Sequence, residues 1–537
     1  MVAPTLPATV IALVIIGAAL PPVVPFRVLG LFPFQGHSHN IMSKSLMEGL
    51  ADRGHEVVML SSLPLMKPRA NYTDLSLAAQ LPPVINTMTY DQLANAHGLQ
   101  LPVWFGEAWG ASWCRTVFES QHFQDIMKGK YGKFDVVFTE VFASDCWAVV
   151  PFKLNVPLIS LDSQPDHPWM HDRVGAINNP SYLFSTNVYH VGPMNLWQRA
   201  RNTYQLLAAQ YLFKVHIQDP SDEVVREFFG ADTPPISEML RSTSLVMING
   251  HVSFTLARPL PPNTLEVGGL HLKNRRPDRS SAPLESELPE LSRWMDGAER
   301  GVILMALGSI VTSSSLPKPA VQAFLDAFAA LGPHYRVVWK YEADDIADSL
   351  PPNVRIASWL PQFDVLAHPK TVLFVGHAGL MGSSEAMFLG VPLVCIPMFS
   401  DQPFNAALFE YKGISVTLDH RRDLNKDTIL AVLRKILDTD KYRSRSREIA
   451  ALFSDRPRSA MDEAVWWTEY VVRHRGARHL RPLGADLPLY QYLLLDVAAV
   501  VLAVGIVTLV LAWLLTSAAL RALQAALRSR GNKRKND

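Results

Sequence analysis

The sequence predicts an α/β protein with two parallel-sheet domains and one C-terminal transmembrane helix. Two stretches, residues 28–61 and 302–356, alternate short apolar runs with helical patterns, as β-α-β units do. At 537 residues the chain is too long for one typical core, so we assign the two stretches to separate domains. Residues 497–520 carry no charged side chain, and an apolar run of this length can cross a bilayer.

The composition excludes some classes of partner and site. The formal net charge is +1, so nucleic acid is not an expected partner. The cysteines have neither CxxC nor metal-ligand spacing, and three of them cannot build a disulfide framework; they are Cys114, Cys146 and Cys395. Cys395 lies in an apolar run and is expected to be an inert core residue.

The N-terminus is predicted to be a signal peptide over residues 1–22. An apolar run, residues 10–20, precedes two prolines and has the length of a signal-peptide core. The segment before it lacks lysine and arginine, so a buried first strand or helix is the alternative. We favour the signal peptide because a clear strand, residues 28–32, follows immediately.

The first β-α-β unit has a strand at 28–32, a helix at 43–53 and a strand at 56–61. His37 and His39 fall in the turn after the first strand. Imidazoles exchange protons near neutral pH, so either histidine could be a general base, although a structural role is the more common use of a single histidine.

A third strand, residues 134–139, is followed by Glu140 and then by Asp145. A carboxylate at a strand end can orient a histidine and stabilise its imidazolium, and either acid could do so here. Capping or surface positions are the alternative for both. Aromatic side chains further on could line an apolar pocket, although core packing accounts for most of them: Trp169, Tyr182, Phe184, Tyr189 and Trp197.

In the second domain, a buried strand at 371–375 runs into a turn of small residues and then a helix at 380–389. The turn contains His377 and Gly379 on either side of Ala378. A turn of this kind at a helix N-terminus is an anion site, because the free N–H groups of the first helical turn point at the ligand. His377 could donate a hydrogen bond to a phosphate oxygen.

Flanking residues fit the other parts of a sugar nucleotide. Trp359 offers an aromatic face for a base, and the Glu385 carboxylate can accept two hydrogen bonds from a ribose diol. Asp401 and Gln402 follow the strand predicted at 393–396, at the sheet edge where open α/β folds bind ligands. A carboxylate accepts hydrogen bonds and an amide both donates and accepts them, so this pair of side chains can bind sugar hydroxyls.

Together these motifs resemble the donor-binding signature of the UDP-glycosyltransferases, an inverting family that transfers sugar from UDP-sugars to small lipophilic acceptors. The matching motifs are W-L-P-Q, H-x-G, S-x-E-A, G-V-P and D-Q, in that order. One departure is Ala378, where the family usually has glycine, asparagine or cysteine. A nicotinamide-dependent oxidoreductase is disfavoured, because no G-x-G-x-x-G follows the first strand.

The resemblance implies a GT-B arrangement, in which two Rossmann-like domains face each other across a cleft. Residues 23–272 would form the acceptor-binding domain, 273–287 a non-helical linker and 288–480 the UDP-sugar-binding domain. An aromatic-rich helix within 455–475 would pack back onto the first domain.

The resemblance also implies which residues catalyse the reaction and which bind the UDP-sugar. The family's catalytic histidine precedes an R-G-H-like triplet, which here is residues 53–55, and this spacing selects His39 over His37. Glu140 takes the place of the family's aspartate, with Asp145 as the alternative partner. The expected UDP-sugar site comprises Ser309, Trp359, Gln362, His377, Gly379, Ser383, Glu385, Asp401 and Gln402. No metal is expected, and no cofactor besides the UDP-sugar co-substrate.

The reaction implied is inverting transfer of a hexose, with glucose favoured, to a hydroxyl of a small lipophilic acceptor of xenobiotic, phenolic or steroid-like type. Such conjugation is a detoxification reaction. Glucuronosyl transfer by the same mechanism is one alternative. A catalytically silent membrane-anchored binding protein is the other, and its mark would be loss of His39 or of the donor residues.

The location implied is the endoplasmic-reticulum membrane, single-pass, with both domains lumenal. The tail, residues 521–537, is basic and therefore expected to be cytoplasmic. Its last residues resemble a K-x-K-x-x retrieval signal, with a plain basic flank as the alternative. Asn71 heads a usable N-glycosylation sequon. A homo-oligomer is left open.

Overall fold

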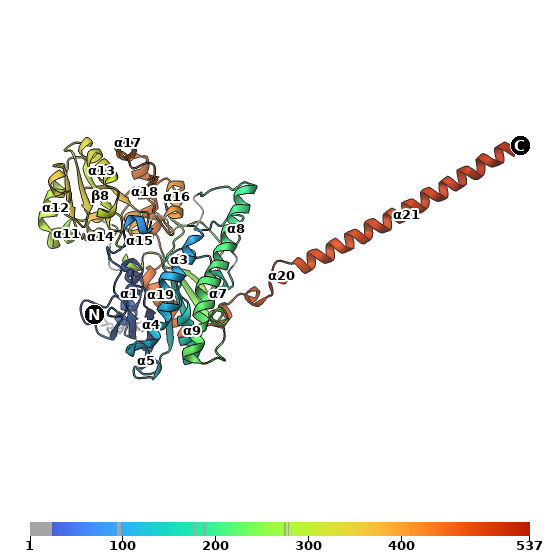
Figure 1. Cartoon of the computed structure of the whole chain (residues 1–537), viewed down its shortest axis with the longest axis horizontal. Coiled ribbons are helices and arrows are strands. Elements are labelled where there is room, and N and C mark those ends of the chain that lie inside the picture. The colour runs from blue at the N-terminus through green and yellow to red at the C-terminus, as the bar shows by residue number, and fades with distance from the viewer. Residues whose placement is uncertain are drawn as a thin grey trace, which may run out of the picture. The chain divides into compact units, whose positions relative to one another are not determined.

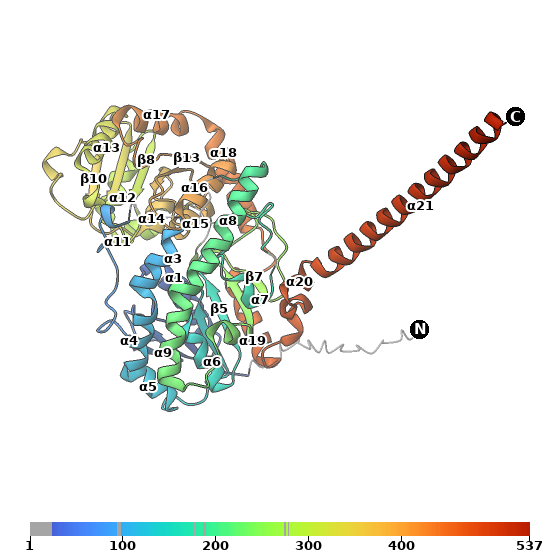
Figure 2. The same ribbon diagram turned by 45° about the vertical axis from the view of Figure 1, so that its right-hand side comes forward.

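The structure, a computed structural model, describes residues 24–93, 98–176, 178–185, 190–272, 275, 277 and 279–536. The predicted signal peptide lies outside the described residues. The chain divides into two units, one ending at Leu480 and the other running from Arg481 to the C-terminus. The first unit holds two α/β lobes, drawn in blue to green and in yellow to orange in Figures 1 and 2.

The first lobe is built on a fully parallel seven-stranded sheet with the order β3-β2-β1-β4-β5-β6-β7. The strands β1, β4, β5 and β6 are buried on both faces, as the near-continuous apolar runs predict. The strand order reverses between β1 and β4, which places a ligand crevice at their carboxyl ends. The strands are β1 (Arg27–Phe32), β2 (Glu56–Ser61), β3 (Tyr72–Ser76), β4 (Val136–Glu140), β5 (Leu158–Asp162), β6 (Thr243–Ile248) and β7 (Thr264–Glu266).

The second lobe is built on a parallel six-stranded sheet with the order β10-β9-β8-β11-β12-β13. Its order reverses between β8 and β11, so its crevice lies at the carboxyl ends of those two strands. The strands are β8 (Gly301–Ala306), β9 (Tyr335–Lys340), β10 (Val354–Ala357), β11 (Thr371–Gly376), β12 (Leu393–Cys395) and β13 (Ser415–Thr417).

Helices cover both faces of each sheet, as parallel sheets require. The first lobe contributes α1 (His37–Asp52), α3 (Gln100–Trp109), α4 (Ala111–Glu119), α5 (Gln121–Met127), α6 (Val149–Leu154), α7 (His171–Val174), α8 (Leu196–Phe213), α9 (Asp219–Phe229) and α10 (Ile236–Leu240). The second contributes α11 (Ala282–Glu287), α12 (Pro289–Asp296), α13 (Lys318–Ala330), α14 (Gln362–Ala367), α15 (Leu380–Phe388), α16 (Gln402–Tyr411), α17 (Lys426–Leu437) and α18 (Asp440–Ser454).

Helix α19 (Ala460–Arg473) returns from the second lobe to the first, where the resemblance placed it. Its buried residues Ala464, Val465 and Val471 join a core with residues of β1, β2 and β4. Figure 1 shows α19 beside α1. The two lobes are therefore tied together at the C-terminal end of the unit as well as by the linker.

Three expectations need correction. Helix α1 begins at His37 rather than at residue 43, so His37 and His39 occupy its first turn. The linker is not wholly irregular, because α11 lies within it, and Arg275 donates to Asp364 at 2.6 Å, which docks the linker on the second lobe.

The third correction concerns cysteine. Cys114 on α4 and Cys146 form a disulfide, with their Cα atoms 6.1 Å apart, although the cysteine count and spacing predicted no disulfide framework. The pairing joins positions 32 residues apart, so only the folded chain brings them together. Cys395 is buried and free, as expected.

The C-terminal unit contains α20 (Leu489–Tyr492) and α21 (Leu495–Asn536). Helix α21 extends beyond the predicted 497–520 at both ends and continues into the basic tail. Residues Leu495–Gly531 are long and apolar enough to cross a membrane, with a mean hydropathy of 2.8 in the best window. The chain thus carries a membrane-span candidate at its C-terminus.

Candidate functional site

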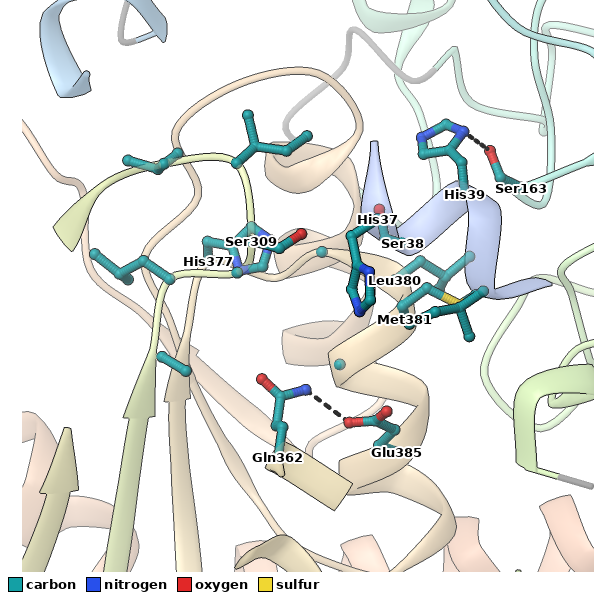
Figure 3. Close-up of a pocket in the computed structure, with 18 of the residues that line it drawn as sticks. His37, Ser38, His39, Ser163, Ser309, Gln362, His377, Leu380, Met381 and Glu385 are labelled. Atoms are coloured by element: carbon teal, nitrogen blue, oxygen red, sulfur yellow. Dashed lines mark hydrogen bonds between the residues drawn. The ribbon is translucent and has the colours of Figure 1, made fainter. Parts of the chain in front are cut away.

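A cavity of about 500 Å³ lies between the carboxyl ends of the two sheets and is lined by both lobes. Figure 3 shows His39 entering it from α1 and His377 entering it from the turn after β11. Both loops follow the strands at which the sheet order reverses, so each lobe turns its crevice toward the other. The other predicted residues on its lining are Ser309, Trp359, Gln362, Gly379, Glu385, Asp401 and Gln402.

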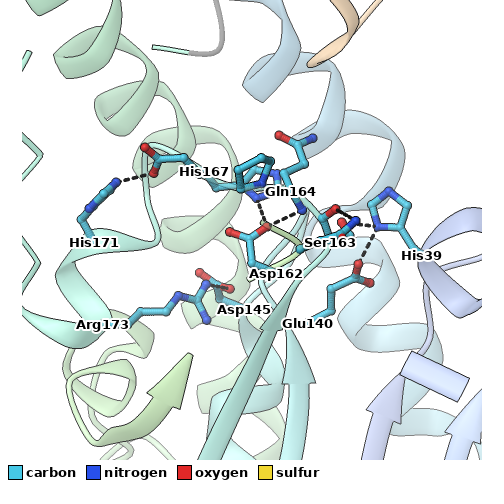
Figure 4. Close-up of polar contacts among 12 residues, drawn as sticks. His39, Glu140, Asp145, Asp162, Ser163, Gln164, His167, His171 and Arg173 are labelled. Carbon is cyan, nitrogen blue, oxygen red and sulfur yellow. Dashed lines mark hydrogen bonds and ion pairs between the residues drawn. The ribbon is translucent and has the colours of Figure 1, made fainter. Parts of the chain in front are cut away.

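The imidazole of His39 is held by two groups at the ends of neighbouring strands. Its Nδ1 lies 2.5 Å from Oε1 of Glu140, the last residue of β4, and 2.9 Å from Oγ of Ser163, which follows β5 (Figure 4). A carboxylate can only accept, so Nδ1 carries the proton and donates it to Glu140. Nε2 then keeps its lone pair and can accept a proton from a ligand.

Aromatic rings surround the same imidazole. The ring of Phe34 lies 4.6 Å from it and that of Phe142 lies 4.4 Å from it, measured between centroids. Phe105 and Trp109 contact Phe142 in turn, and both line the cavity. The first-lobe part of the cavity is therefore an apolar aromatic chamber whose titratable lining residues are His37 and His39.

Asp145, the alternative partner of His39, makes different contacts. It forms a buried ion pair with Arg173 and accepts from Nε2 of Gln218 at 3.1 Å. The structure therefore corrects this alternative: the turn after β4 directs Asp145 into the core of the lobe, while Glu140, still on the strand, faces His39 (Figure 4).

The imidazole of His377 packs tightly against two glycines, Gly379 in the turn before α15 and Gly308 in the loop after β8. A Cβ atom on Gly379 would lie 2.3 Å from Nε2 of His377, and one on Gly308 would lie 2.7 Å from its Cε1. The imidazole is thus clamped between two glycines beside Ser309. Ala378 adopts φ 63°, a left-handed conformation that bends the chain into the helix N-terminus.

His377 is neutral at physiological pH. Burial and the nearby Lys340 ammonium lower its pKa to about 4. Its Nδ1 is buried and has no hydrogen-bond partner among the described residues. A neutral imidazole with a free ring nitrogen, next to the unpaired N–H groups of α15, can donate to an anionic ligand without adding a buried charge.

Beside the turn, Gln362 donates to Glu385 at 2.6 Å (Figure 3). Burial raises the pKa of Glu385 to about 7, partly offset by the hydrogen bond from Gln362. Trp359 is 48% exposed, so its ring is accessible from the cavity. Its edge contacts His37 of the first lobe, with centroids 5.4 Å apart. An aromatic face and a carboxylate thus stand side by side, as a nucleoside requires.

At the other end, Asp401 accepts from Nδ2 of Asn405 at 2.5 Å, and burial raises its pKa. The side-chain oxygen of Gln402 accepts from the backbone N–H groups of Met398 and Phe399 at 2.9 and 3.2 Å. Because this oxygen is already used, Gln402 offers a ligand mainly its amide N–H groups.

Besides Asp145, two further predicted residues lie apart from the cavity. Ser383 is buried on α15 and is not part of the lining, because it falls on the helix face turned toward the core. Asn71 is exposed at φ 57°, in the turn that leads into the edge strand β3. Its glycosylation stays a prediction.

Sequence reasoning missed Ser163 and Lys340. The signal for Ser163 was the apolar run ending at Asp162, since polar residues that follow a buried strand collect at the same sheet edge. Lys340 ends β9 and lines the cavity, and it is only 6% exposed. Within the described residues, no group of three or more His, Cys, Asp or Glu is placed to hold a metal ion.

Comparisons with known proteins agree with this geometry. The family model "UDP-glucoronosyl and UDP-glucosyl transferase" matches residues 28–529. The chain is 37% identical over 473 residues to UDP-glucosyltransferase 2 of Dactylopius coccus, covering 88% of each protein. It is 30% identical over 488 residues to UDP-glucuronosyltransferase 2B18 of Macaca fascicularis, covering 87% of this chain and 88% of that protein.

Solved structures show the same fold. A UDP-glucosyltransferase from Polygonum tinctorium superposes with a TM-score of 0.55 at 16% identity, covering 84% of this chain and 99% of that one. The glycotransferase of kitacinnamycin gives 0.54 at 17% identity, covering 84% and 100%. With two facing parallel-sheet lobes, a donor turn, and a family match over nearly its whole length, the chain belongs to the UDP-glycosyltransferase family and is a glycosyltransferase of the GT-B fold.

Proposed function

We propose that the protein transfers glucose from UDP-glucose to the hydroxyl of a small lipophilic, aromatic acceptor, with inversion at the anomeric carbon. One observation carries this proposal: the His39–Glu140 pair opens into the same cavity as the donor turn of His377. An acid–base group and a diphosphate site that share one cavity have the arrangement that a direct displacement needs.

In the first step, Nε2 of His39 takes the proton of the acceptor hydroxyl while Glu140 holds the proton on Nδ1 and stabilises the imidazolium. The acceptor oxygen attacks the anomeric carbon from the face opposite the diphosphate. As the new carbon–oxygen bond forms, the bond to the diphosphate oxygen breaks and its electron pair leaves with UDP. Negative charge grows on the diphosphate, where the amides of α15, His377 and Ser309 would stabilise it.

The aromatic chamber supports the choice of acceptor. First-lobe residues of the cavity lining include no Asp, Glu, Lys or Arg, whereas five are aromatic apart from histidine: Phe34, Trp104, Phe105, Trp109 and Phe142. Flat apolar rings bury well against such walls, and a charged acceptor would lose its hydration without gaining an ion pair. A neutral phenol therefore fits better than a carboxylate-bearing acceptor.

Glucose is favoured over glucuronate by the relatives' names, since the 37% identical protein is called a glucosyltransferase and the 30% identical one a glucuronosyltransferase. Glucuronosyl transfer through the same residues is the second candidate. We place the enzyme in the endoplasmic-reticulum membrane with its lobes lumenal. The disulfide supports an oxidising compartment, and the basic residues after the apolar helix support a cytoplasmic tail.

The test is a donor panel of UDP-glucose, UDP-glucuronate, UDP-galactose and UDP-N-acetylglucosamine, offered with simple phenols and flavonoids and read by mass spectrometry. We expect glucosides with the β configuration. The His39→Ala variant should lose transfer while still binding UDP. Full turnover by His39→Ala would overturn the assigned base, and a product only from UDP-glucuronate would replace glucose as the donor.

A further inference from the structure

The stretch between β3 and α3 leaves its own sheet and runs to the second lobe, as the blue segment beside the yellow lobe in Figure 2 shows. Its residues 82–88, here called the strap, contact both halves of the active site. At the near end, the N–H of Val84 donates to the carbonyl of Gln35 at 3.0 Å, and Val84 pairs with Gly36 in a parallel bridge. Gly36 is the N-cap of α1, whose first turn carries His39.

The far end of the strap joins the loop after β8, in which Gly308 packs against His377 of the donor turn. The N–H of Asn86 donates to the carbonyl of Ser309 at 2.8 Å, and that of Met88 donates to Ile310 at 3.3 Å. The N–H of Thr312 in turn donates to the carbonyl of Met88 at 3.0 Å. The backbone that precedes the general base and the backbone that follows β8 are thus both hydrogen-bonded to one short extended segment.

The side chain of Asn86 completes the connection. Asn86 adopts φ 51°, a left-handed conformation that asparagine tolerates better than most residues. Its Oδ1 accepts from the ammonium of Lys340 at 2.8 Å, and Lys340 also donates to Glu342 at 2.6 Å. The second carboxylate oxygen of Glu342 accepts from the N–H of Ser313 at 2.7 Å, in the same loop after β8 as Ser309.

The Lys340–Glu342 ion pair in this network is buried, which makes the network stiff. Lys340 is 6% exposed, and its two oxygen partners leave it one N–H at most for the cavity beside Trp359. Removing one partner of a buried charged hydrogen bond leaves the other unsatisfied, so the arrangement resists distortion. Beyond the strap, Leu93 packs into the core of the second lobe, so the strap is anchored at both ends.

We propose that Asn86 is a positioning residue: with its side-chain bond to Lys340 and its backbone bond to Ser309, it sets the distance between the catalytic helix α1 and the loop after β8, which packs against the donor turn. Asn86 does not line the cavity, so it acts on the alignment of the two lobes and not on either ligand. A displacement of His39 from its in-line position slows the chemical step even when the donor is bound normally. The inference needs only the glycosyl transfer activity of the family and no particular sugar or acceptor.

The test is Asn86→Gly, which keeps the left-handed backbone accessible and removes only the side chain. We expect kcat at saturating UDP-sugar to fall about tenfold, the size of one lost hydrogen bond to a charged group, while the Kd for UDP stays unchanged. The matched control is Asn155→Gly, because Asn155 has φ 53° at the end of α6, away from the lobe interface. That variant should keep the wild-type kcat.

Two further variants keep the proposal falsifiable. Asn86→Asp retains an oxygen for Lys340 and should recover kcat. In a Lys340→Met background, Asn86→Gly should cause no further loss, because the bond it would remove is already absent. An unchanged kcat in Asn86→Gly, a rise in the UDP Kd without a fall in kcat, or additive losses in the double variant would each overturn the positioning role.

Discussion

Nδ1 of His39 lies 2.5 Å from Oε1 of Glu140, and Glu140 ends the strand next to the one that leads into the His39 helix. This contact fixes the tautomer of the imidazole and leaves the lone pair of Nε2 able to accept a proton. Of the two carboxylates near β4, Glu140 therefore supports His39, and Asp145 pairs with Arg173 in the core.

Glu140→Gln should lower kcat by about 10²–10⁴-fold, the usual contribution of an acid–base pair, because an amide stabilises neither the tautomer nor the imidazolium. The melting temperature should stay close to wild type, since glutamine fills the same space. Steady-state kinetics and thermal unfolding of the same preparation measure both. Wild-type kcat in this variant would show that Glu140 does not support His39.

Asp145→Asn should behave in the opposite way. It removes the carboxylate charge from the buried Asp145–Arg173 ion pair, and breaking such a pair typically costs about 3–5 kcal/mol of stability. We expect a clearly lower melting temperature and a near-normal kcat for the protein that remains folded. A large fall in kcat with an unchanged melting temperature would instead return Asp145 to the catalytic machinery.

Donor affinity should depend on pH through Glu385, whose pKa burial raises to about 7. Above that pH the group is a carboxylate that can accept from both ribose hydroxyls, and below it the group is protonated and accepts less well. Affinity for uridine should therefore rise from pH 6 to pH 8. Uridine carries no phosphate, so the ligand itself does not titrate in this range.

The control for this dependence is Glu385→Gln, measured by calorimetry across the same pH range. The variant should bind uridine weakly and with a flat profile. Equal slopes in wild type and variant would mean that another group controls the titration.

Gly379→Ala should weaken UDP binding strongly, because its Cβ would lie 2.3 Å from Nε2 of His377, whose ring is clamped on its other side by Gly308. Gly382→Ala is the matched control one turn along α15. Its Cβ would meet only the far end of Gln362 at 2.8 Å, and that flexible amide can move aside. Calorimetry with UDP should show the larger loss for Gly379→Ala, and equal losses would contradict the clamp.

Loss of the disulfide between Cys114 and Cys146 should destabilise the first lobe by about 2–4 kcal/mol without altering the cavity. Replacing both residues by alanine and measuring unfolding by denaturant tests this. Thiol labelling of the denatured, unreduced protein should find one reactive cysteine, Cys395. Three labelled cysteines would show that the bond does not form.

The sequence by itself determined the local features. Buried parallel strands are continuous apolar runs, and small residues followed by a helical pattern mark an anion-binding turn, so the α/β class and the turn at His377 were readable without a structure. The family motifs identified His39 and the donor residues in the same way. The membrane-span candidate needed only length and the absence of charge.

The tertiary structure decided everything that depends on which segments meet. Spacing could not choose between Glu140 and Asp145, because the folded chain decides that Glu140, at the end of β4, faces α1 and that the following turn directs Asp145 into the core. The Cys114–Cys146 bond joins elements far apart in the chain. The strap through Asn86 has no sequence signature: its backbone bonds and its side-chain bond to Lys340 join two lobes, and such contacts exist only once both lobes have folded against each other.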